Sequence, residues 1–178
     1  PDADHGMGVP GDAVRTADVL VPTVTDTITE EMLGHPDCKL RMIANFGNGV
    51  DNIDVTAAHA RGITVTNTPK VLTEDTADMT LALILAVTRR IPEGMAEMQA
   101  GRWQGWSPIS HLGGRLGGRQ LGILGMGRIG RAIAARARQF RLNLVYHNRH
   151  RLPEAVEAEL GVTWADSIEA LAAASDIF

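Results

Sequence analysis

The chain has 178 residues, of which 44% are hydrophobic, and this length and composition suit a globular core in one large or two small domains. Its 17 basic and 21 acidic side chains give a formal net charge of −4, which offers no basis for binding nucleic acid or an anionic membrane. No apolar run has the roughly 18 residues of a membrane span, and one cysteine excludes an internal disulfide, so we expect a soluble cytoplasmic protein without a metal site.

Short apolar runs alternate with short helical segments in the first third of the chain. Strands are predicted over residues 17–21 (as a buried strand), 41–44 and 63–66. Helices are predicted over residues 29–33 and 54–60. Thr29 is the expected N-cap of the first helix, and Gly62 ends the second in a position that favours a C-cap. Strands and helices in this order imply parallel pairing in an α/β unit.

A loop with two glycines, residues 45–50, follows the second predicted strand. Open α/β sheets bind ligands just past the carboxyl ends of their strands, and consecutive N–H groups in a glycine turn form a site for an anion. This interpretation makes Asn48 and Gly49 candidate ligand-binding residues. The residues alone leave open a second interpretation, in which the glycines serve only the backbone angles of a turn.

The pattern changes after Thr68-Pro69. We predict one long helix over residues 74–100, with Thr73 as its cap, because apolar residues recur at helical spacing. A long ordered connection with two tryptophans is predicted over residues 101–118, where glycines are frequent.

A glycine-rich motif lies between an apolar run over residues 120–124 and a helix predicted over 131–140, with a second apolar run over 143–147 behind it. Its residues are Gly125, Met126, Gly127, Arg128, Ile129 and Gly130. A preceding strand, a following helix and closure of the whole unit within about 30 residues are the setting of a dinucleotide-binding loop. The alternative is a glycine-rich turn that binds nothing.

Each glycine of the motif has an expected task in such a loop. Gly125 permits the tight turn out of the strand, Gly127 lets the backbone approach a pyrophosphate, and Gly130 lets the helix pack close to the sheet. The N–H groups of the first helical turn and the helix dipole then favour an anion at this end of the helix.

The residues after the second apolar run indicate which coenzyme is preferred. NAD sites carry an acidic residue about 20 positions after the glycine loop, which binds the ribose 2′-hydroxyl. Residues 121–151 contain seven arginines and no acid. Arg149, beside Asn148, is placed to clasp a 2′-phosphate through two N–H groups, so we predict NADP(H) in preference to NAD(H). We interpret the other candidates as a solvated face; they are Arg136, Arg138 and Arg141.

The last four residues, 175–178, predict the entry to a further strand. A doubly wound dinucleotide domain needs two βαβαβ halves, and the residues after Gly125 suffice for about one. We therefore expect a dinucleotide-binding domain that is truncated at its C-terminal end. The expected layout is a smaller α/β unit over residues 1–70 and the dinucleotide-binding unit with its linking helix over residues 71–178.

Three stretches, residues 48–54, 67–78 and 122–130, resemble the D-2-hydroxyacid dehydrogenase family, particularly its glyoxylate and hydroxypyruvate reductase branch. The likeness runs from about Ala17 to Phe178. It implies a two-domain α/β enzyme with a flavodoxin-like substrate domain and a Rossmann dinucleotide-binding domain, both partial here. It also implies a homodimer that reduces a 2-keto acid with a nicotinamide coenzyme.

The resemblance assigns roles to single residues. The backbone N–H groups of Asn48 and Gly49 would hold the substrate carboxylate, and Leu72 would line the substrate pocket. Thr76 would touch the coenzyme, although alone it is an ordinary helix-start residue. Trp106 would lie near the substrate of its own or a partner subunit, or else pack in the core.

The resemblance also implies a histidine that donates the proton, a glutamate that keeps it protonated and an arginine that orients the substrate. None of the six histidines of this chain is a convincing substitute, so we expect all three residues after Phe178 and no catalytic residue before it. Two alternatives to a keto-acid reductase are a non-catalytic dinucleotide-sensing module and an NAD-dependent phosphite or formate dehydrogenase. The Asn148-Arg149 pair counts against the second.

Overall fold

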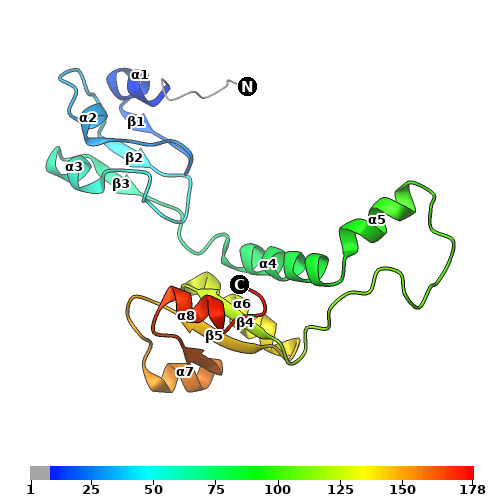
Figure 1. Ribbon diagram of the computed structural model, residues 1–178. Coiled ribbons are helices and arrows are strands. Elements are labelled where there is room, and N and C mark those ends of the chain that lie inside the picture. The colour runs from blue at the N-terminus through cyan, green and yellow to red at the C-terminus, as the bar shows by residue number, and fades with distance from the viewer. Residues whose placement is uncertain (1–8) are drawn as a thin grey trace. The chain divides into compact units, whose positions relative to one another are not determined.

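The computed structural model describes residues 9–178, with side chains from residue 11 onward. The chain divides into two compact units at the boundary between Leu72 and Thr73 (Figure 1). Each unit contains one three-stranded parallel sheet, so the predicted α/β class with two parallel sheets is confirmed. Within the described residues, no helix combines the length and the apolar character needed to cross a membrane.

The first unit is a small sheet in the order β1-β2-β3, with helices between the strands. Its strands are β1 (Val19–Leu20), β2 (Met42–Ala44) and β3 (Thr64–Thr66), and its helices are α1 (Val9–Thr16), α2 (Glu30–Leu33) and α3 (Val55–Ala60). Thr29 caps α2 by accepting the Met32 N–H at 3.3 Å, as predicted. The core of the unit forms around Ile28, Leu33 and Ile43, each at most 1% exposed.

The prediction of a buried first strand is wrong. β1 has only two residues, and the side chains of Val19 and Val21 are 50% and 64% exposed. Among the described residues β1 pairs only with β2, so it lies at an edge of the sheet they form, where an apolar run need not be covered on both faces.

The second unit has the strand order of a dinucleotide-binding half-domain. Its strands are β4 (Gln120–Leu124), β5 (Asn143–His147) and β6 (Val162–Trp164), and its helices are α4 (Thr73–Thr88), α5 (Ile91–Gln99), α6 (Arg128–Gln139), α7 (Glu154–Leu160) and α8 (Ile168–Ala173). After α8 the chain returns to the other side of β4, where Ile177 pairs in parallel with Leu121. The predicted entry to a further strand is thus confirmed, and the strand order changes direction at β4.

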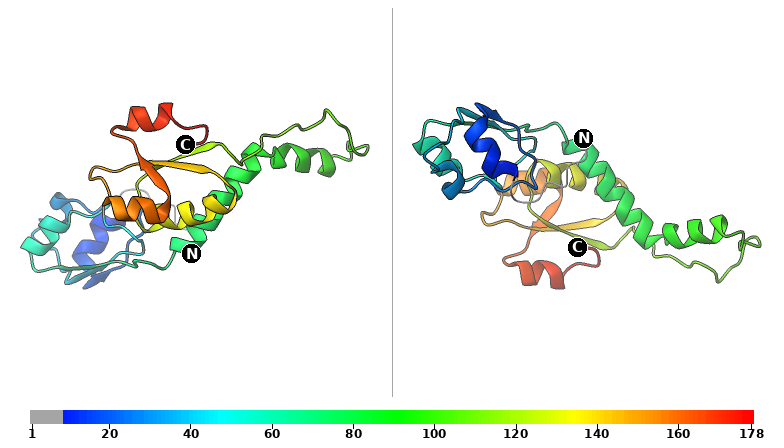
Figure 2. Two further views of the ribbon diagram at one scale, coloured as in Figure 1. Left: turned by 90° about the horizontal axis from the view of Figure 1, so that it is seen from below. Right: turned by 90° about the horizontal axis from the view of Figure 1, so that it is seen from above.

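Helices α6 and α8 lie on opposite faces of this sheet (Figure 2). The core on the α6 side contains Leu121, Ala134, Leu144 and Tyr146, all buried. In a doubly wound sheet, ligands bind at the carboxyl ends of the strands where the order reverses. The reversal at β4 therefore indicates that the loop after this strand is a candidate ligand-binding site.

One long helix over residues 74–100 is a wrong prediction. The chain forms α4 and α5, separated at Arg90, whose φ of 56° is left-handed. Pro92 lies in the first turn of α5, and a proline cannot donate the hydrogen bond that a continuous helix requires at that position. Thr73 is the first residue of α4 rather than its cap.

The interpretation of Arg136 as part of a solvated face is also wrong. Its guanidinium bonds to Glu74 at 2.7 Å and to Asp78 at 2.6 Å, and these two hydrogen bonds raise the pKa of Arg136. Because both carboxylates belong to α4, Arg136 fastens the first turns of α4 to α6. Arg138 is not simply solvated either, since it donates to the backbone oxygen of Glu159 at 3.0 Å.

A polar network with a buried centre and the half-exposed Arg151 at its edge joins β5 to α7. The Tyr146 hydroxyl donates to Oε1 of Glu157 at 2.7 Å, and Arg151 holds the same carboxylate with two bonds of 2.9 and 2.8 Å. Leu152 N–H donates to the Tyr146 oxygen at 2.9 Å. We call these four residues the Glu157 network. The hydrogen bonds from Arg151 and Tyr146 lower the pKa of Glu157 to about 2, whereas burial and the adjacent carboxylate raise the pKa of Tyr146.

The Glu157 network should make the stability of the folded protein decrease at acid pH. A carboxyl whose pKa falls from 4.5 to about 2 on folding stabilises the native state above pH 4.5, and this contribution is lost as the pH drops towards 2. Glu157→Gln should therefore lower the urea midpoint of the full-length protein at pH 7, and the gap to wild type should narrow between pH 5 and pH 3.

The control is Glu154→Gln, which removes an exposed carboxylate from the first turn of the same helix and should show no such narrowing. A gap between wild type and Glu157→Gln that stays constant down to pH 3 would contradict the assigned role of the Glu157 charge.

Candidate functional site

The three glycines after β4 each meet a different constraint. Gly125 has φ of +99°, which side chains rarely adopt, so it permits the turn out of the strand. A Cβ at Gly127 would meet nothing within 4 Å, so the backbone there stays open to an approaching group. A Cβ at Gly130 would lie 2.2 Å from the Gly125 oxygen, which shows how tightly the helix packs on the turn. The geometry is that of the predicted phosphate-binding loop.

Helix α6 begins at Arg128, three residues earlier than predicted, so the last three residues of the motif belong to its first turn. Its N-cap, Gly127, has no side chain to cap the helix. The bond from Arg131 N–H to the Gly127 oxygen, 3.0 Å, starts the helical ladder. The N–H groups of Ile129 and Gly130 therefore face out of the helix end, where the helix dipole also favours an anion.

Asn148 holds the glycine loop to the end of β5. Its Oδ1 accepts the Met126 N–H at 2.7 Å, and the adjacent Gly125 N–H donates to the His147 oxygen at 3.0 Å. The Met126 side chain is buried in the core, at 2% exposure. Met126 and Asn148 thus shape the loop, a role that their sequence positions, 22 residues apart, did not indicate.

A cavity of about 460 Å³ lies at the carboxyl ends of β4 and β5, a size typical of ligand pockets. Its lining residues are Leu124, Gly125, His147, Asn148, Arg149, His150 and Ile168. None of them is acidic. Arg149 is exposed and forms no ion pair with any described residue. The cavity therefore joins the first glycine of the loop to the arginine that was predicted to recognise a 2′-phosphate.

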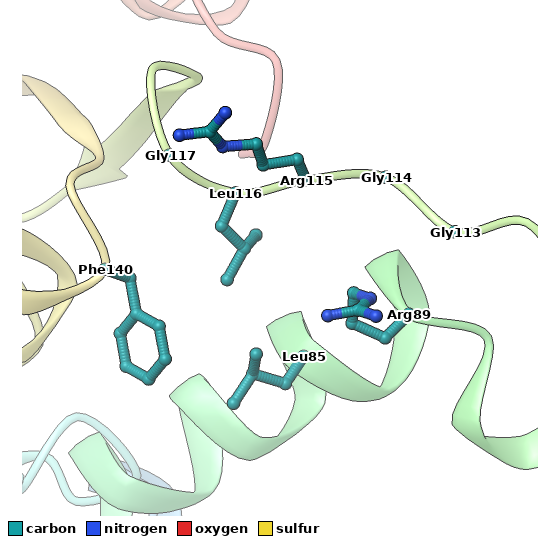
Figure 3. Close-up of a pocket in the computed structure, with 8 residues that line it drawn as sticks. All are labelled: Leu85, Arg89, Gly113, Gly114, Arg115, Leu116, Gly117 and Phe140. Carbon is teal, nitrogen blue, oxygen red and sulfur yellow. The ribbon is translucent and has the colours of Figure 1, made fainter.

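A second cavity of about 420 Å³ lies at the opposite end of the same sheet. The side chains of Leu85, Leu116 and Phe140 face a common space there, while the Arg115 guanidinium lies beside Gly117 (Figure 3). Leu116 and Phe140 precede the amino ends of β4 and β5. Because ligands of doubly wound sheets bind at the carboxyl ends, the cavity beside the glycine loop is the candidate coenzyme site.

The candidate anion-binding loop of the first unit follows β2 and is held by side-chain amides. Asn67 Nδ2 donates to the Asn48 oxygen at 2.7 Å, and Nδ2 of Asn45 donates to the Gly49 oxygen at 2.8 Å. In a trans peptide the N–H points away from the preceding carbonyl, so the bond from Asn67 directs the Gly49 N–H to the opposite side. Asn45, 1% exposed, also bonds to Asn52 at 3.1 Å. Sequence reasoning missed the parts of Asn45 and Asn52.

Glycine at position 49 is not needed for the fold of the loop. Neither Gly47 nor Gly49 has a left-handed φ, so backbone angles do not explain either residue. A Cβ at Gly47 would lie 2.3 Å from Cγ1 of Val24, whereas a Cβ at Gly49 would meet only Oδ2 of Asp51 at an ordinary 3.6 Å. Packing therefore accounts for Gly47 and leaves Gly49 available to a ligand.

The remaining predicted residues lie on connections and helix ends. Leu72 is half-buried in the turn before α4, and Thr76 is half-buried in the first turn of α4. Trp106 is 86% exposed in the connection after α5, so core packing of this residue within the described chain is excluded. It lines a cavity of about 540 Å³ with residues of α5 and the same connection.

Known proteins with the same architecture are found among relatives and solved structures. A glyoxylate reductase from Thermococcus litoralis is 48% identical over 163 residues, which are 89% of this chain and 49% of that protein. The TT0316 protein from Thermus thermophilus is 43% identical with a TM-score of 0.84 over 98% of this chain and 54% of that one. A formate dehydrogenase from Granulicella is 29% identical with a TM-score of 0.84, over 93% and 44% of the two chains.

The chain spans about half the length of the curated relatives it matches. Residues 11–175 match the family model described as D-isomer specific 2-hydroxyacid dehydrogenase, catalytic domain. With the glycine loop, the reversal of strand order at β4 and the amide-held loop after β2, this match shows that the chain belongs to the D-isomer specific 2-hydroxyacid dehydrogenase family.

Proposed function

We propose that the full-length protein reduces a small 2-keto acid, of the glyoxylate or hydroxypyruvate type, to the D-2-hydroxy acid with NADPH. The observation that carries the proposal is the cavity that joins Gly125 to Arg149 without an acidic residue in its lining. The relative from Thermococcus litoralis, named a glyoxylate reductase, supports the choice of substrate class.

The coenzyme would be held at two places on the second unit. Its pyrophosphate would rest at the first turn of α6, beside the open backbone at Gly127. Its 2′-phosphate would receive two N–H groups from Arg149, and no carboxylate of the lining would repel it. Such a charge-assisted bond contributes about 1.5 to 3 kcal/mol, which corresponds to a preference for NADPH of roughly one to two orders of magnitude.

The substrate carboxylate would be held at the loop after β2. The Gly49 N–H has a direction set by the Asn67 bond to the preceding carbonyl, and the absence of a side chain at Gly49 leaves room for the anion. The bound nicotinamide would supply the hydride. Two of the described histidines already have partners: Nδ1 of His147 lies 2.8 Å from the Ala165 oxygen, and His111 pairs with Glu97. From the family resemblance we propose a proton donor outside residues 9–178.

Formate oxidation is the second candidate, because the Granulicella formate dehydrogenase shares the fold. The two functions are distinguished by assaying the full-length protein with a panel of keto acids and NADPH, and with formate and NAD or NADP. Turnover of formate without turnover of any keto acid would replace the first proposal with the second.

We also propose a homodimer, formed through an apolar face on α4 and α5. Met79, Leu83 and Val87 recur every four residues along α4 and are 61%, 59% and 75% exposed. Met95 and Met98 of α5 are 56% and 58% exposed. Exposed apolar side chains grouped in this way on helices are typical of a protein interface.

The first prediction from the proposed function concerns coenzyme choice. Wild type should show a kcat/KM with NADPH roughly ten to a hundred times that with NADH, and Asn148→Asp with Arg149→Ala should turn the preference towards NADH. Aspartate retains an oxygen for the Met126 N–H, so the loop should keep its shape. Arg115→Ala, at the other end of the sheet, is the control. A wild-type preference for NADH would refute the NADPH assignment.

A second prediction separates the two glycines of the substrate loop. Gly49→Ala should fold normally but raise KM for the keto acid about tenfold, because its methyl group obstructs the carboxylate. Gly47→Ala should instead lower the melting temperature, because its methyl group would collide with Val24. The pair is compared by steady-state kinetics and thermal unfolding. An unchanged KM in Gly49→Ala would remove this residue from the substrate site.

A third prediction tests the dimer. Leu83→Glu with Val87→Glu should convert the full-length protein from a dimer to a monomer in size-exclusion chromatography with light scattering, because charges do not tolerate burial in an apolar interface. Asp75→Asn, an exposed change on the same helix, should leave the dimer intact. A wild-type protein that elutes as a monomer would overturn the proposal.

A further inference from the structure

We infer that Glu157 is a positioning residue for coenzyme selection: through the Glu157 network it holds the segment that presents Arg149 to the 2′-phosphate. This inference rests on the proposed NADPH preference and assigns that preference partly to a residue that does not line the coenzyme cavity. Three observations on the second unit carry it.

The segment between β5 and α7, residues 148–153, is fixed at both ends and carries Arg149 between them. At its start, Asn148 binds the Met126 N–H at 2.7 Å. At its end, Leu152 N–H donates to the Tyr146 hydroxyl at 2.9 Å, and Arg151 is held by Glu157. A short segment tied at both ends loses backbone freedom before any ligand arrives.

The tie at the Glu157 end is rigid. The Glu157 side chain is 10% exposed and its carboxylate receives three hydrogen bonds, two from Arg151 and one from Tyr146, which is itself fully buried. Two parallel bonds from a guanidinium define an orientation as well as a distance. Removal of Arg151 leaves the largely buried Glu157 carboxylate without its charged partner, and removal of Glu157 leaves the half-exposed Arg151 without its bidentate partner.

The network also separates the roles of the two arginines. The Arg151 charge is neutralised by Glu157, and its guanidinium lies 5.4 Å from the centre of the Trp164 ring. That ring stacks on His147, which lines the coenzyme cavity, with a centroid distance of 6.4 Å. Arg149 has no ion pair among the described residues. Glu157 thus pairs with Arg151, while Arg149 remains available to a ligand.

A purely electrostatic effect of the network predicts a different outcome from positioning. Glu157→Gln removes a negative charge near the cavity, and on charge alone it would strengthen binding of a 2′-phosphate. Arg151→Met removes a positive charge and on charge alone would weaken it. If the network positions Arg149, both substitutions loosen the same segment and both reduce the preference for NADPH.

The test measures kcat/KM with NADPH and with NADH for the full-length wild type, Glu157→Gln and Arg151→Met. We expect the ratio of kcat/KM with NADPH to kcat/KM with NADH to fall about tenfold in both variants. Most of this fall should come from a lower kcat/KM with NADPH. A general loss of stability would lower both efficiencies together and leave the ratio unchanged, which would overturn the inference. Opposite shifts in the two variants would also overturn it, in favour of a charge effect.

Tyr146→Phe is the milder variant, because it keeps the buried ring and removes only the hydroxyl that links Leu152 to Glu157. It should lower the ratio about threefold, and it keeps the test decisive if Glu157→Gln fails to fold. A wild type that prefers NADH refutes the proposed function itself. A wild type that prefers NADPH, with unchanged ratios in Tyr146→Phe and Arg151→Met, refutes only the role of Glu157.

Discussion

The hydrogen bond from the Met126 N–H to Asn148 is the contact on which the coenzyme site depends. It joins the turn that follows β4 to the segment that follows β5, and these two pieces of chain carry the two expected phosphate contacts. The pyrophosphate end is set by Gly125 and Gly130, which allow the chain to turn sharply and α6 to approach closely. In the proposed function, Arg149 would hold the 2′-phosphate. Because one bond links both ends, their separation is determined before a ligand binds.

The candidate binding loops of the two units are each held by side-chain amides that bond to backbone groups. In the second unit Asn148 holds a backbone N–H, and in the first unit Asn45 and Asn67 hold the carbonyls of Gly49 and Asn48. Binding a backbone carbonyl on one side of a trans peptide directs the next N–H to the other side. Loops without regular structure thus present donors in defined directions, which a binding site for a small carboxylate requires.

Local patterns in the sequence were enough to predict much of this architecture. The apolar runs over residues 120–124 and 143–147 coincide with β4 and β5, because a buried parallel strand needs a continuous apolar segment bounded by turn residues. The motif glycines were assigned individually because each steric constraint is local. The break at Arg90 was also signalled locally, by Pro92, and was overlooked.

Other features were beyond such reasoning because they depend on how separate elements pack against one another. Arg136 meets carboxylates about sixty residues earlier in the chain, so nothing near it indicated that it fastens α6 to α4. The exposure of Val19 and Val21 likewise depends on which elements cover the sheet and not on the apolar character of the run itself. The Glu157 network lies within residues 146–157, but its bonds depend on how β5, the following segment and α7 pack together, which the sequence pattern does not indicate.

Recognition of a 2′-phosphate by Arg149 can be measured by binding alone, without catalysis. Isothermal titration of the full-length protein with adenosine 2′,5′-bisphosphate and with adenosine 5′-monophosphate isolates the contribution of that phosphate group. The first compound should bind at least about tenfold more tightly, and Arg149→Ala should abolish the difference. Equal affinities in the wild type would contradict it.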